Sequence, residues 1–296
     1  MQALTSVDIS DLTIFSKGKV RNVYDFGDRL LIVATDRISA FDYVLATGIP
    51  DKGKILTAIS ASWFRQLEPI SPHHLLSTDI RDFPASAAKY GSLLGDRSML
   101  VRKAERIDME CIVRGYLSGS AWKEYQATGK VAGLELPRGL GPNARLDLPM
   151  FTPSTKSDEG HDRNITISEM SQILGAALGR ELVARSLRLF EEARRIAEPK
   201  GITIVDTKFE FGYVAGELVL IDEAFTPDSS RFLVREQGAS QPINLDKQFI
   251  RDYLESTGWD KSPPAPELPP EIVTEARRRY LVILNRLTGG RPSWAE

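Results

Sequence analysis

The chain has 296 residues, of which 42% are apolar and 26% charged, as in an ordinary globular protein with a sizeable core. Its 38 Lys and Arg nearly balance its 40 Asp and Glu, and the formal net charge of −2 gives no electrostatic reason to expect binding to nucleic acid or to a membrane surface. A single cysteine excludes an internal disulfide, and neither a signal peptide nor an apolar run of about 18 residues is present, so we expect a cytoplasmic protein of one large domain or two closely packed lobes.

The first element that the sequence predicts is a hairpin from Gly18 onward. Its strands are the alternating VRNVYDF and the apolar LLIVAT, joined by a turn at Gly27-Asp28, whereas residues 1–16 show no strong periodicity. The hairpin starts with a basic segment made of Lys17, Gly18, Lys19, Val20 and Arg21. Such a segment could cover phosphate groups, as glycine loops do in kinases, or form an exposed strand edge whose lysines deter aggregation. The spacing alone does not decide between the two.

Two glycine-rich segments imitate nucleotide-binding motifs. Residues 48–55, GIPDKGKI, have Ile55 in place of the hydroxyl residue of a phosphate-binding loop, and no strong parallel-strand pattern precedes them. Residues 139–144, GLGPNA, contain a proline and do not join a strand to a helix. We therefore interpret neither segment as a nucleotide site.

The N-terminal part of the chain is predicted to form a sheet with one long helix. The helix spans residues 54–67 and buries Ile55, Ile59 and Trp63. Strands at residues 99–103 and 109–114 are expected to complete the sheet, and residues 108–114 are expected to form a hinge into a second lobe. This divides the chain into a sheet-rich lobe, residues 1–112, and an α+β lobe, residues 113–296. Cys111, within the apolar run MECIV, is interpreted as a buried and inert thiol.

An anion site is predicted where the second lobe begins. Arg114 precedes Ser118-Gly119-Ser120, which open the helix AWKEYQATG, and the amides of a helix N-terminus beside an arginine bind anions. An ordinary N-cap explains the serines equally well, but not the arginine. Residues 151–165 are predicted to form a polar loop without regular structure. A capping box at Thr166 and Glu169 predicts the start of a helix, and a second helix is predicted over residues 180–197.

The prediction centres on a hairpin within residues 202–232, whose two apolar runs flank a turn at Ala215-Gly216. Side chains alternate along a strand, so one face should carry Asp206, Lys208 and Glu210, and the other Thr207, Phe209 and Phe211. The return strand ends in Asp222-Glu223, so that pairing brings Asp222 near Glu210. Clustered carboxylates repel unless a cation lies between them, which predicts a Mg²⁺ site at Glu210 and Asp222. A solvated hairpin with chance charges is the alternative.

The segments after this hairpin add further polar groups. TPDSSR brings Ser229-Ser230 and Arg231, whose guanidinium suits a phosphate or a carboxylate. DKQFIRDYLESTG predicts a short helix that buries Phe249, Ile250 and Tyr253 and leaves Lys247, Gln248 and Arg251 for a ligand or for solvent. A proline-rich link at residues 263–270 leads to a last helix from Glu271, in which Arg277 interrupts the apolar side.

Together, these segments resemble one enzyme family. The similarity lies in KGKVRNVY, ATDRISAFDYVLATGIPDKGKILT, ECIVRGYLSGSAWKEYQATGKVAG, DTKFEFG, DEAFTPDSSRF and DKQFIRDYL. These are similar to SAICAR synthetase, or phosphoribosylaminoimidazole-succinocarboxamide synthase, over most of residues 17–260. The resemblance implies a two-lobed α+β fold of antiparallel sheets with helices and an ATP cleft between the lobes. Asn22 departs from the family pattern, in which an acidic residue is more frequent at this position.

The resemblance also implies the ligands and the residues that bind them. ATP and Mg²⁺ are the expected cofactors, carboxyaminoimidazole ribotide (CAIR) and L-aspartate the expected small-molecule substrates, and a monomer is our working expectation. The residues expected to bind ATP and its metal are Lys17, Gly18, Lys19, Val20, Arg21, Glu110, Cys111, Val113, Lys208, Glu210 and Asp222, with residues 110–113 offering a backbone edge to adenine by analogy with kinase-like lobes. Those expected to bind substrates are Arg37, Ser39, Arg114, Ser120, Lys156, Asp228, Ser230, Arg231, Lys247, Gln248 and Arg251. Lys208, Lys19 and Asp36 are expected to act in catalysis, and Glu159 and Asp162 match positions near the substrates.

The family's reaction would join L-aspartate to the carboxylate of CAIR and cleave ATP to ADP and phosphate, through an acyl phosphate that the amine attacks. Two alternatives stay open at this point. One is a kinase-like phosphotransferase that acts on a different small acceptor. The other is a nucleotide-sensing module without catalysis, which would not need Lys208, Glu210, Asp222 and Arg231 together.

Overall fold

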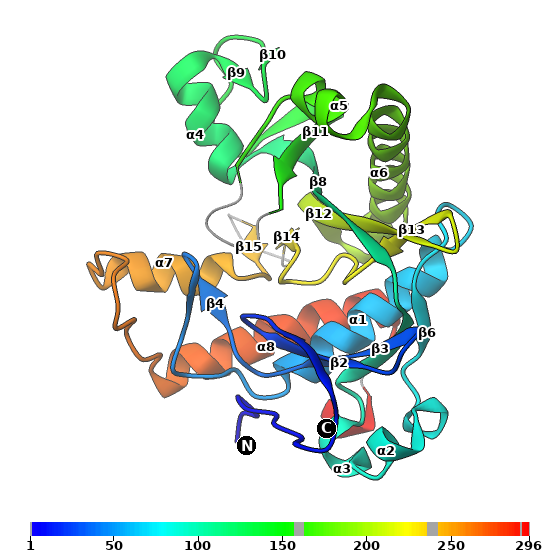
Figure 1. The fold of residues 1–296 in the computed structure, drawn as a ribbon. Coiled ribbons are helices and arrows are strands. Elements are labelled where there is room, and N and C mark those ends of the chain that lie inside the picture. The colour runs from blue at the N-terminus through cyan, green and yellow to red at the C-terminus, as the bar shows by residue number, and fades with distance from the viewer. Residues whose placement is uncertain (1, 157–162, 236–241, 291, 296) are drawn as a thin grey trace.

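Two antiparallel sheets organise the chain in the computed structural model, which describes residues 2–156, 163–235, 242–290 and 292–295 (Figure 1). The first sheet has the order β1 (Ile14–Lys17), β2 (Arg21–Asp25), β3 (Arg29–Ala34), β7 (Ser98–Arg102), β6 (Leu75–Ser77). The second has the order β11 (Ala144–Thr155), β8 (Glu105–Leu117), β12 (Ile202–Val214), β14 (Ser230–Val234), β15 (Ile243–Asn244), and β13 (Glu217–Ile221) also pairs with β12. Two short hairpins are formed by β4 (Ser39–Ala40) with β5 (Tyr43–Val44) and by β9 (Lys130–Val131) with β10 (Leu134–Glu135).

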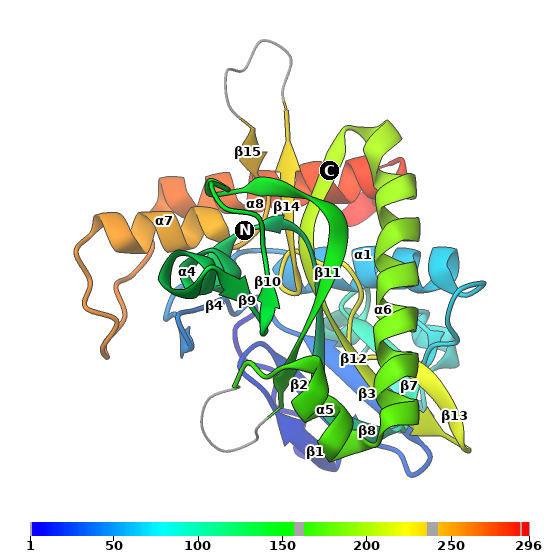
Figure 2. The ribbon, with the colours of Figure 1, turned by 90° about the horizontal axis from the view of Figure 1, so that it is seen from above.

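Helices cover both sheets. They are α1 (Lys52–Leu67), α2 (Ala85–Ala88), α3 (Gly91–Leu94), α4 (Gly119–Thr128), α5 (Ile167–Leu174), α6 (Ala176–Ala197), α7 (Gln248–Ser256) and α8 (Pro270–Thr288), with short 3₁₀ turns η1 (Ile80–Asp82), η2 (Glu198–Lys200) and η3 (Ser293–Ala295). Figure 2 shows α6 running along the second sheet, which it contacts at β8, β11 and β12. Helix α1 lies between the first sheet and α8. Among the described residues, no helix is both long and apolar enough to cross a membrane. The predicted α+β class with antiparallel sheets is confirmed.

A single apolar core joins the two sheets. It contains Ile32 from β3, Trp63 from α1, Phe209 from β12 and Phe190 from α6, and the ring of Phe225 lies 5.0 Å from that of Trp63 and 5.1 Å from that of Phe209. The predicted helix burial is confirmed, since Ile55, Ile59 and Trp63 are all 0% exposed. Burial of side chains of this size stabilises a fold by about 1.5–3 kcal/mol each. The sheets are therefore fixed to one another where they meet.

Local signals placed several elements correctly. The capping box at Thr166 and Glu169 is present at the start of α5. The hairpin of β12 and β13 turns at Ala215-Gly216, both with positive φ, and its register pairs Glu210 with Ile221, so that Asp222 follows directly. Arg277, the exception in the last helix, forms an ion pair with Asp51 at 2.6 Å.

Three predictions about strands were wrong. Strand β1, which was not predicted, pairs with β2. The basic segment at residues 17–21, expected to be the start of a strand, therefore contains the turn between β1 and β2, where the Gly18 amide donates to the carbonyl of Arg21. The strand expected at residues 109–114 lies within β8, which belongs to the second sheet and not the first. Residues 151–155, expected in a loop, belong to β11 because they pair with β8. The errors at β8 and β11 concern partners distant in sequence, whereas β1 pairs with its neighbour β2 and lacked a periodic pattern.

The point at which the chain passes from the first sheet to the second indicates where the boundary between the lobes would lie. The chain leaves the first sheet at Arg102, the end of β7, and enters the second at Glu105, the start of β8. Residues 112 and 113, between which the sequence placed the boundary, both lie inside β8. The division into residues 1–112 and 113–296 remains a prediction, and the change of sheet at residues 103–104 favours an earlier boundary.

Candidate active site

The site is built on the charged face of β12. Asp206, Lys208 and Glu210 alternate with Thr207, Phe209 and Phe211, which are at most 1% exposed and lie in the interior. Strand β8 brings Arg114 opposite Asp206 and Glu110 opposite Glu210. Because β8 and β12 both run through the middle of the sheet, charged side chains are gathered in a buried place. Each of them needs a partner of opposite charge.

Two glutamates and two lysines form the first charged cluster. The Lys208 Nζ lies 2.5 Å from Glu110 Oε1 and 3.2 Å from Glu210 Oε1, and the Lys156 Nζ lies 2.5 Å from Glu210 Oε1 and 3.5 Å from Glu110 Oε1. Burial by itself would raise the pKa of Glu210, but Lys208 and Lys156 outweigh it and hold that pKa at about 2. Conversely, burial would lower the pKa of Lys208, and Glu210 and Glu110 raise it well above its usual value. Glu210 and Lys208 are therefore both charged at neutral pH.

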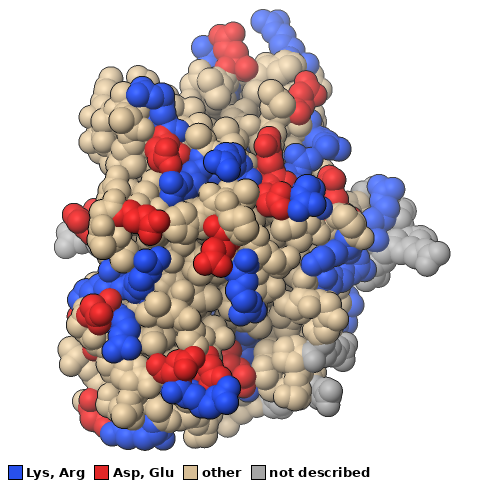
Figure 3. Space-filling view, turned by 90° about the vertical axis from the view of Figure 1, so that its right-hand side faces the viewer, with Lys and Arg blue, Asp and Glu red and all other residues tan. Residues whose placement is uncertain are grey.

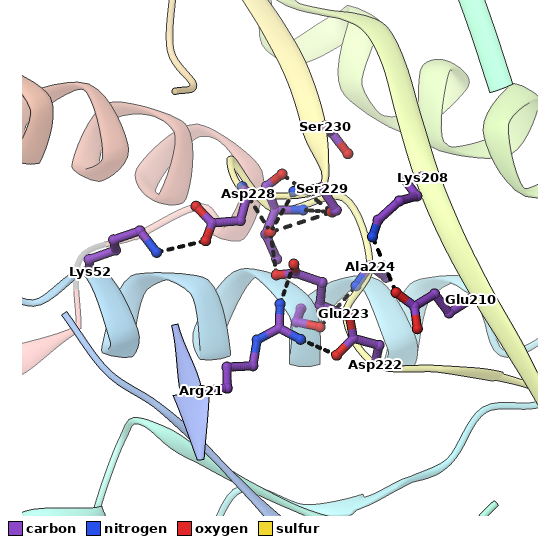
Figure 4. Close-up of polar contacts among 12 residues, drawn as sticks. Arg21, Lys52, Lys208, Glu210, Asp222, Glu223, Ala224, Asp228, Ser229 and Ser230 are labelled. Carbon is purple, nitrogen blue, oxygen red and sulfur yellow. Dashed lines mark hydrogen bonds and ion pairs between the residues drawn. The ribbon is translucent and has the colours of Figure 1, made fainter. Parts of the chain in front are cut away.

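Asp222 and Glu223 continue the cluster at the end of β13. Figure 4 shows both carboxylates facing Arg21 of β2, which forms an ion pair with each of them. Burial raises the pKa of Asp222 to about 6, Arg21 opposes that rise, and repulsion from Glu210 and Glu223 adds to it. Asp222 has a φ of 65°, a left-handed conformation that costs little for Asp or Asn and more for other side chains. The backbone thus presents this carboxylate toward its neighbours.

The donor set of this cluster fits a hard divalent cation. Glu210 and Asp222 supply carboxylate oxygens, the ligands that Mg²⁺ prefers, and their mutual repulsion raises the pKa of Asp222. A cation between them would relieve that repulsion. Within the described part of the chain, no group of three or more His, Cys, Asp or Glu side chains is placed to hold a metal. The pair therefore suits a cation that takes its remaining ligands from substrate phosphates and water.

An anion pocket lies on the same face, next to Lys208. The Arg114 Nη2 lies 3.3 Å from Ser120 Oγ, and Asp206 Oδ2 accepts from Arg114 at 3.5 Å and from Arg231 at 2.8 Å. Two guanidinium groups held by one carboxylate retain one unit of positive charge. They border a cavity of about 280 Å³ lined by Ile112, Arg114, Ser120, Asp206, Thr207, Lys208, Pro227, Asp228, Ser229, Ser230, Arg231, Asp246, Lys247 and Arg251. The cavity thus unites most of the predicted substrate residues.

Glycine at position 119 is needed for this arrangement. Gly119 starts α4 with a φ of 58°, and a Cβ atom there would lie 2.2 Å from Nη2 of Arg231. The absent side chain lets Arg231 lie against the helix N-terminus, beside Ser120. The motif Ser118-Gly119-Ser120 was interpreted through its serines, but its glycine sets the position of the arginine.

A second, larger cavity of about 740 Å³ shares Arg231 with the first. Its lining includes Trp122, Asn244, Gln248 and Asp252. Gln248, predicted to bind substrate beside Lys247, lines this second cavity, where its Nε2 donates to Asp252 at 2.8 Å. Lys247 and Arg251 line the first.

Several predicted site residues have structural partners instead. Asp36 is 1% exposed, and its oxygens accept from the amides of Leu4 and Gly53 and from Arg97 at 3.0 Å, so its carboxylate is not available for catalysis as predicted. Arg37 donates to the carbonyls of Gly18 and Lys19 and so supports the basic loop. Arg37 and Ser39 are absent from the lining of both cavities.

The basic loop itself is open to solvent. Lys17 lies 3.7 Å from Asp8, Lys19 lies 2.6 Å from Asp42, and both lysine side chains are more than half exposed. Arg21 differs from them, because it points inward to Asp222 and Glu223 and is 14% exposed. Asn22, the residue that departs from the family pattern, is buried. It donates to the carbonyl of Val7 and accepts from Arg37, so it helps to hold the arginine that supports the basic loop.

The predicted adenine edge is wrong. Residues 110–113 lie in the middle of β8, with β11 paired on one side and β12 on the other, so their backbone groups do not form an open edge. Cys111 and Val113 are 0% exposed, which confirms the predicted burial of this cysteine, and burial raises the pKa of the Cys111 thiol and so disfavours its thiolate. Glu110 enters the site through its side chain, as a partner of Lys208. Glu159 and Asp162 lie outside the described residues.

The sequence analysis gave no site role to three residues that the structure brings in. Asp206 joins the two arginines, Asp246 accepts from the amides of Phe232 and Gln248, and Lys52 forms a buried ion pair with Asp228. Asp206 could have been found from its place in the charged row of β12. Nothing local in the sequence indicates Lys52, whose partner lies 176 residues away. Asp246 has a local partner in the amide of Gln248, so its place just before the short helix was a usable signal.

Comparisons with known proteins agree with the resemblance noted in the sequence. The family model for SAICAR synthetase matches residues 14–266. A phosphoribosylaminoimidazole-succinocarboxamide synthase of Geotalea uraniireducens is 53% identical over 288 residues, which are 96% of this chain and 97% of that relative. The solved structure of SAICAR-synthase from Saccharomyces cerevisiae, complexed with SAICAR, is 38% identical with a TM-score of 0.87, over 98% of this chain and 99% of that one. A SAICAR synthetase in complex with ADP, 24% identical with a TM-score of 0.70 over 95% and 99% of the two chains, shares the fold.

The role of Gly119 predicts a selective effect on anion binding. In Gly119→Ala the new methyl group displaces the Arg231 guanidinium, so binding of ribose 5-phosphate should weaken roughly ten- to a hundredfold, as expected for a lost charge-assisted hydrogen bond of roughly 1.5–3 kcal/mol. Titration calorimetry measures this. Gly129→Ala is the matched control, because Gly129 ends the same helix with a φ of 71° and a Cβ atom there would have no neighbour within 4 Å, so the variant carries the same backbone strain without the clash. Equal affinity in both variants would show that Arg231 does not hold the anion.

Proposed function

The chain belongs to the SAICAR synthetase family, and from this premise we propose how its own residues carry out the family's reaction. That reaction condenses CAIR with L-aspartate, converts ATP to ADP and phosphate, and yields SAICAR in the biosynthesis of purines. The enzyme is accordingly a carbon–nitrogen ligase. We propose ATP with Mg²⁺ as its cofactors. A monomeric state and a cytoplasmic location remain predictions from the sequence.

The chemical difficulty is the carboxylate of CAIR, which is a poor electrophile. Transfer of the γ-phosphoryl group to a carboxylate oxygen gives an acyl phosphate, and attack of the aspartate amine on its carbonyl carbon forms the amide and expels phosphate. The protein then contributes binding, orientation and charge, and no side chain needs to be a nucleophile. This agrees with a cavity lined by lysines, arginines and carboxylates, since Cys111 is buried in the apolar core and not in the lining of the cavity.

The observation that carries the proposal is the placement of two kinds of charged site on one face of β12. The anion pocket of Arg114, Ser120 and Arg231 lies on one side of Lys208, and the carboxylates of Glu210 and Asp222 lie on the other. In the proposed arrangement the pocket holds the phosphate of CAIR, and the carboxylates face the nucleotide. The reacting carboxylate then meets the γ-phosphate near the Lys208 ammonium, which would neutralise charge that develops during transfer.

Glu210 and Asp222 are the residues proposed to hold Mg²⁺. When bound, the cation would neutralise the charge of the ATP phosphates and polarise them. Lys156 pairs with both Glu110 and Glu210, and it follows β11 directly. It would thus neutralise these carboxylates from the side opposite Asp222 and limit their repulsion of the nucleotide.

The exposed turn between β1 and β2 is proposed to cover the ATP phosphates with Lys17, Gly18, Lys19 and Val20. Two observations support this proposal. Arg37 holds the turn by donating to the carbonyls of Gly18 and Lys19, and the side chains of Lys17 and Lys19 stay exposed. Arg21 is not part of that surface, since it pairs with Asp222 and Glu223. Lys247, Arg251 and Ser230 complete the substrate side of the cavity.

The acyl phosphate is tested by following oxygen. With ¹⁸O in both carboxylate oxygens of CAIR, one labelled oxygen should appear in each phosphate released, because the bridging oxygen of an acyl phosphate comes from the carboxylate. Mass spectrometry of the phosphate measures this. Unlabelled phosphate would exclude the mechanism while leaving the ligase activity itself in place.

The proposed metal role is tested with Asp222→Asn. Asparagine also tolerates the left-handed conformation, so the fold should persist, while the loss of an anionic ligand should lower kcat by at least about 10²- to 10³-fold at ordinary Mg²⁺. Since the folded pKa of Asp222 is about 6, above its ordinary value of 3.8, its ionised form destabilises the fold at pH 7. The variant should therefore melt at an equal or higher temperature than the wild type at pH 7. That difference should shrink as pH falls from about 6 to 4, where the wild-type carboxyl takes up its proton.

Asp28→Asn is the control for this variant, because the Asp28 side chain is 88% exposed and lines neither cavity. Near-normal turnover of Asp222→Asn at ordinary Mg²⁺ would refute the ligand role. A lower melting temperature at pH 7 would show that Asp222 supports the fold.

A further inference from the structure

Lys52 is a fully buried lysine whose carboxylate partner, Asp228, lines the cavity of about 280 Å³. It is the first residue of α1, within the segment GIPDKGKI that imitates a phosphate-binding loop, and its side chain is 0% exposed. Its Nζ lies 2.7 Å from Oδ2 of Asp228, in the segment between β13 and β14 (Figure 4). The segment is therefore not a phosphate loop, and its lysine binds a carboxylate from the other sheet.

Asp228 is shared between two lysines. Lys247, which lines the cavity at the start of α7, lies 3.2 Å from the same Oδ2 atom, and Oδ1 of Asp228 is buried with no hydrogen-bond partner among the described residues. Burial by itself would raise the pKa of Asp228, but Lys247 and Lys52 outweigh it and hold that pKa at about 2. Burial lowers the pKa of Lys247, Asp228 raises it, and Lys52 lowers it, as expected when one carboxylate serves two cations.

The sharing leaves positive charge at the cavity. Two ammonium groups and one carboxylate sum to one positive charge, and of the two lysines only Lys247 lines the cavity, beside Arg231 and Arg251. Without Lys52, Asp228 would compensate Lys247 completely, and the cavity would lose an unpaired charge for an anionic ligand. If the buried pair of Lys52 and Asp228 served the fold alone, it would not need Lys247 as a third charged group facing the cavity.

We propose that Lys52 is a positioning residue for substrate binding, which shares Asp228 so that Lys247 stays available to an anionic oxygen of the substrate. This inference rests on the proposed function, in which the ligand of this cavity is the ribotide CAIR. Lys52 does not touch the substrate, and its effect passes through Asp228 to Lys247.

The charge count makes the proposal testable with three variants. Lys52→Met should weaken CAIR binding by at least about tenfold, because the group then sums to zero, while the KM for ATP should change less than about twofold. The double variant Lys52→Met with Asp228→Asn restores one positive charge on Lys247 and should recover most of the affinity. Asp228→Asn alone leaves two positive charges and should bind CAIR at least as tightly as the wild type.

Titration calorimetry with CAIR, melting temperatures and the KM for ATP are measured for each variant. Lys54→Met is the matched control, since Lys54 lies two residues along the same helix, is 23% exposed and has its nearest carboxylate, Asp96, at 3.9 Å, so CAIR affinity should not change. Equal CAIR affinity in wild type and Lys52→Met, or no recovery in the double variant, would overturn the proposal. If Lys52→Met does not fold, Asp228→Asn decides, and a tenfold weaker affinity in it would overturn the proposal as well.

A failure of the proposed function gives a different result. If the wild-type protein binds no CAIR, the same variants are titrated with inorganic phosphate. Weaker phosphate binding in Lys52→Met, with recovery in the double variant, would support the role of Lys52 although the ligand had been misassigned. Equal phosphate binding in wild type and Lys52→Met would overturn that role independently.

Discussion

The constraint on which this structure depends is that a row of charged side chains lies in the middle of a buried sheet. Asp206 and Glu210 on β12 are 7% and 6% exposed, and an unpaired charge in such a place would cost several kcal/mol. The neighbouring strands supply the partners. Arg114 of β8 pairs with Asp206, Glu110 of β8 pairs with Lys208, and Lys156, which follows β11, pairs with Glu210. The same pairing that makes burial tolerable also places cations and carboxylates next to one another, as the proposed phosphate-transfer site requires. Buried ion pairs in general add little net stability, because the cost of removing two charges from water offsets most of their attraction.

The two sheets meet at this charged row. Arg21 of β2 reaches Asp222, and Lys52 of α1 reaches Asp228, so two ion pairs tie the single loop between β13 and β14 to the first sheet and to α1 (Figure 4). The shared core around Trp63 and Phe225 holds the sheets at a fixed separation. On the face in Figure 3, charged side chains of both signs are interspersed, as expected for a net charge of −2.

The parts of the fold that the sequence revealed are those set by neighbours in the chain. The hairpin of β12 and β13 follows from alternation and a turn at Ala215-Gly216, and helix α5 follows from its capping box. The grouping of Arg114, Ser120 and Arg231 came from the family resemblance, and the structure brings them to one cavity. The errors arose where a partner is distant: β8 has the same apolar pattern whichever sheet it joins, and nothing near Asp36 shows that Leu4, Gly53 and Arg97 enclose it. Lys52 was missed for the same reason, since its partner lies 176 residues away.

The central claim is that one site joins two small substrates at the expense of ATP, and steady-state release of ADP tests it most directly. A coupled assay measures ADP with CAIR, L-aspartate and Mg²⁺-ATP all present, and then with each substrate omitted in turn. Continuous release should require all three, because the acyl phosphate that forms without L-aspartate has no amine to consume it and turnover stops after about one equivalent. Continuous release at an undiminished rate without CAIR or without L-aspartate would contradict the account, as would its absence with all three present.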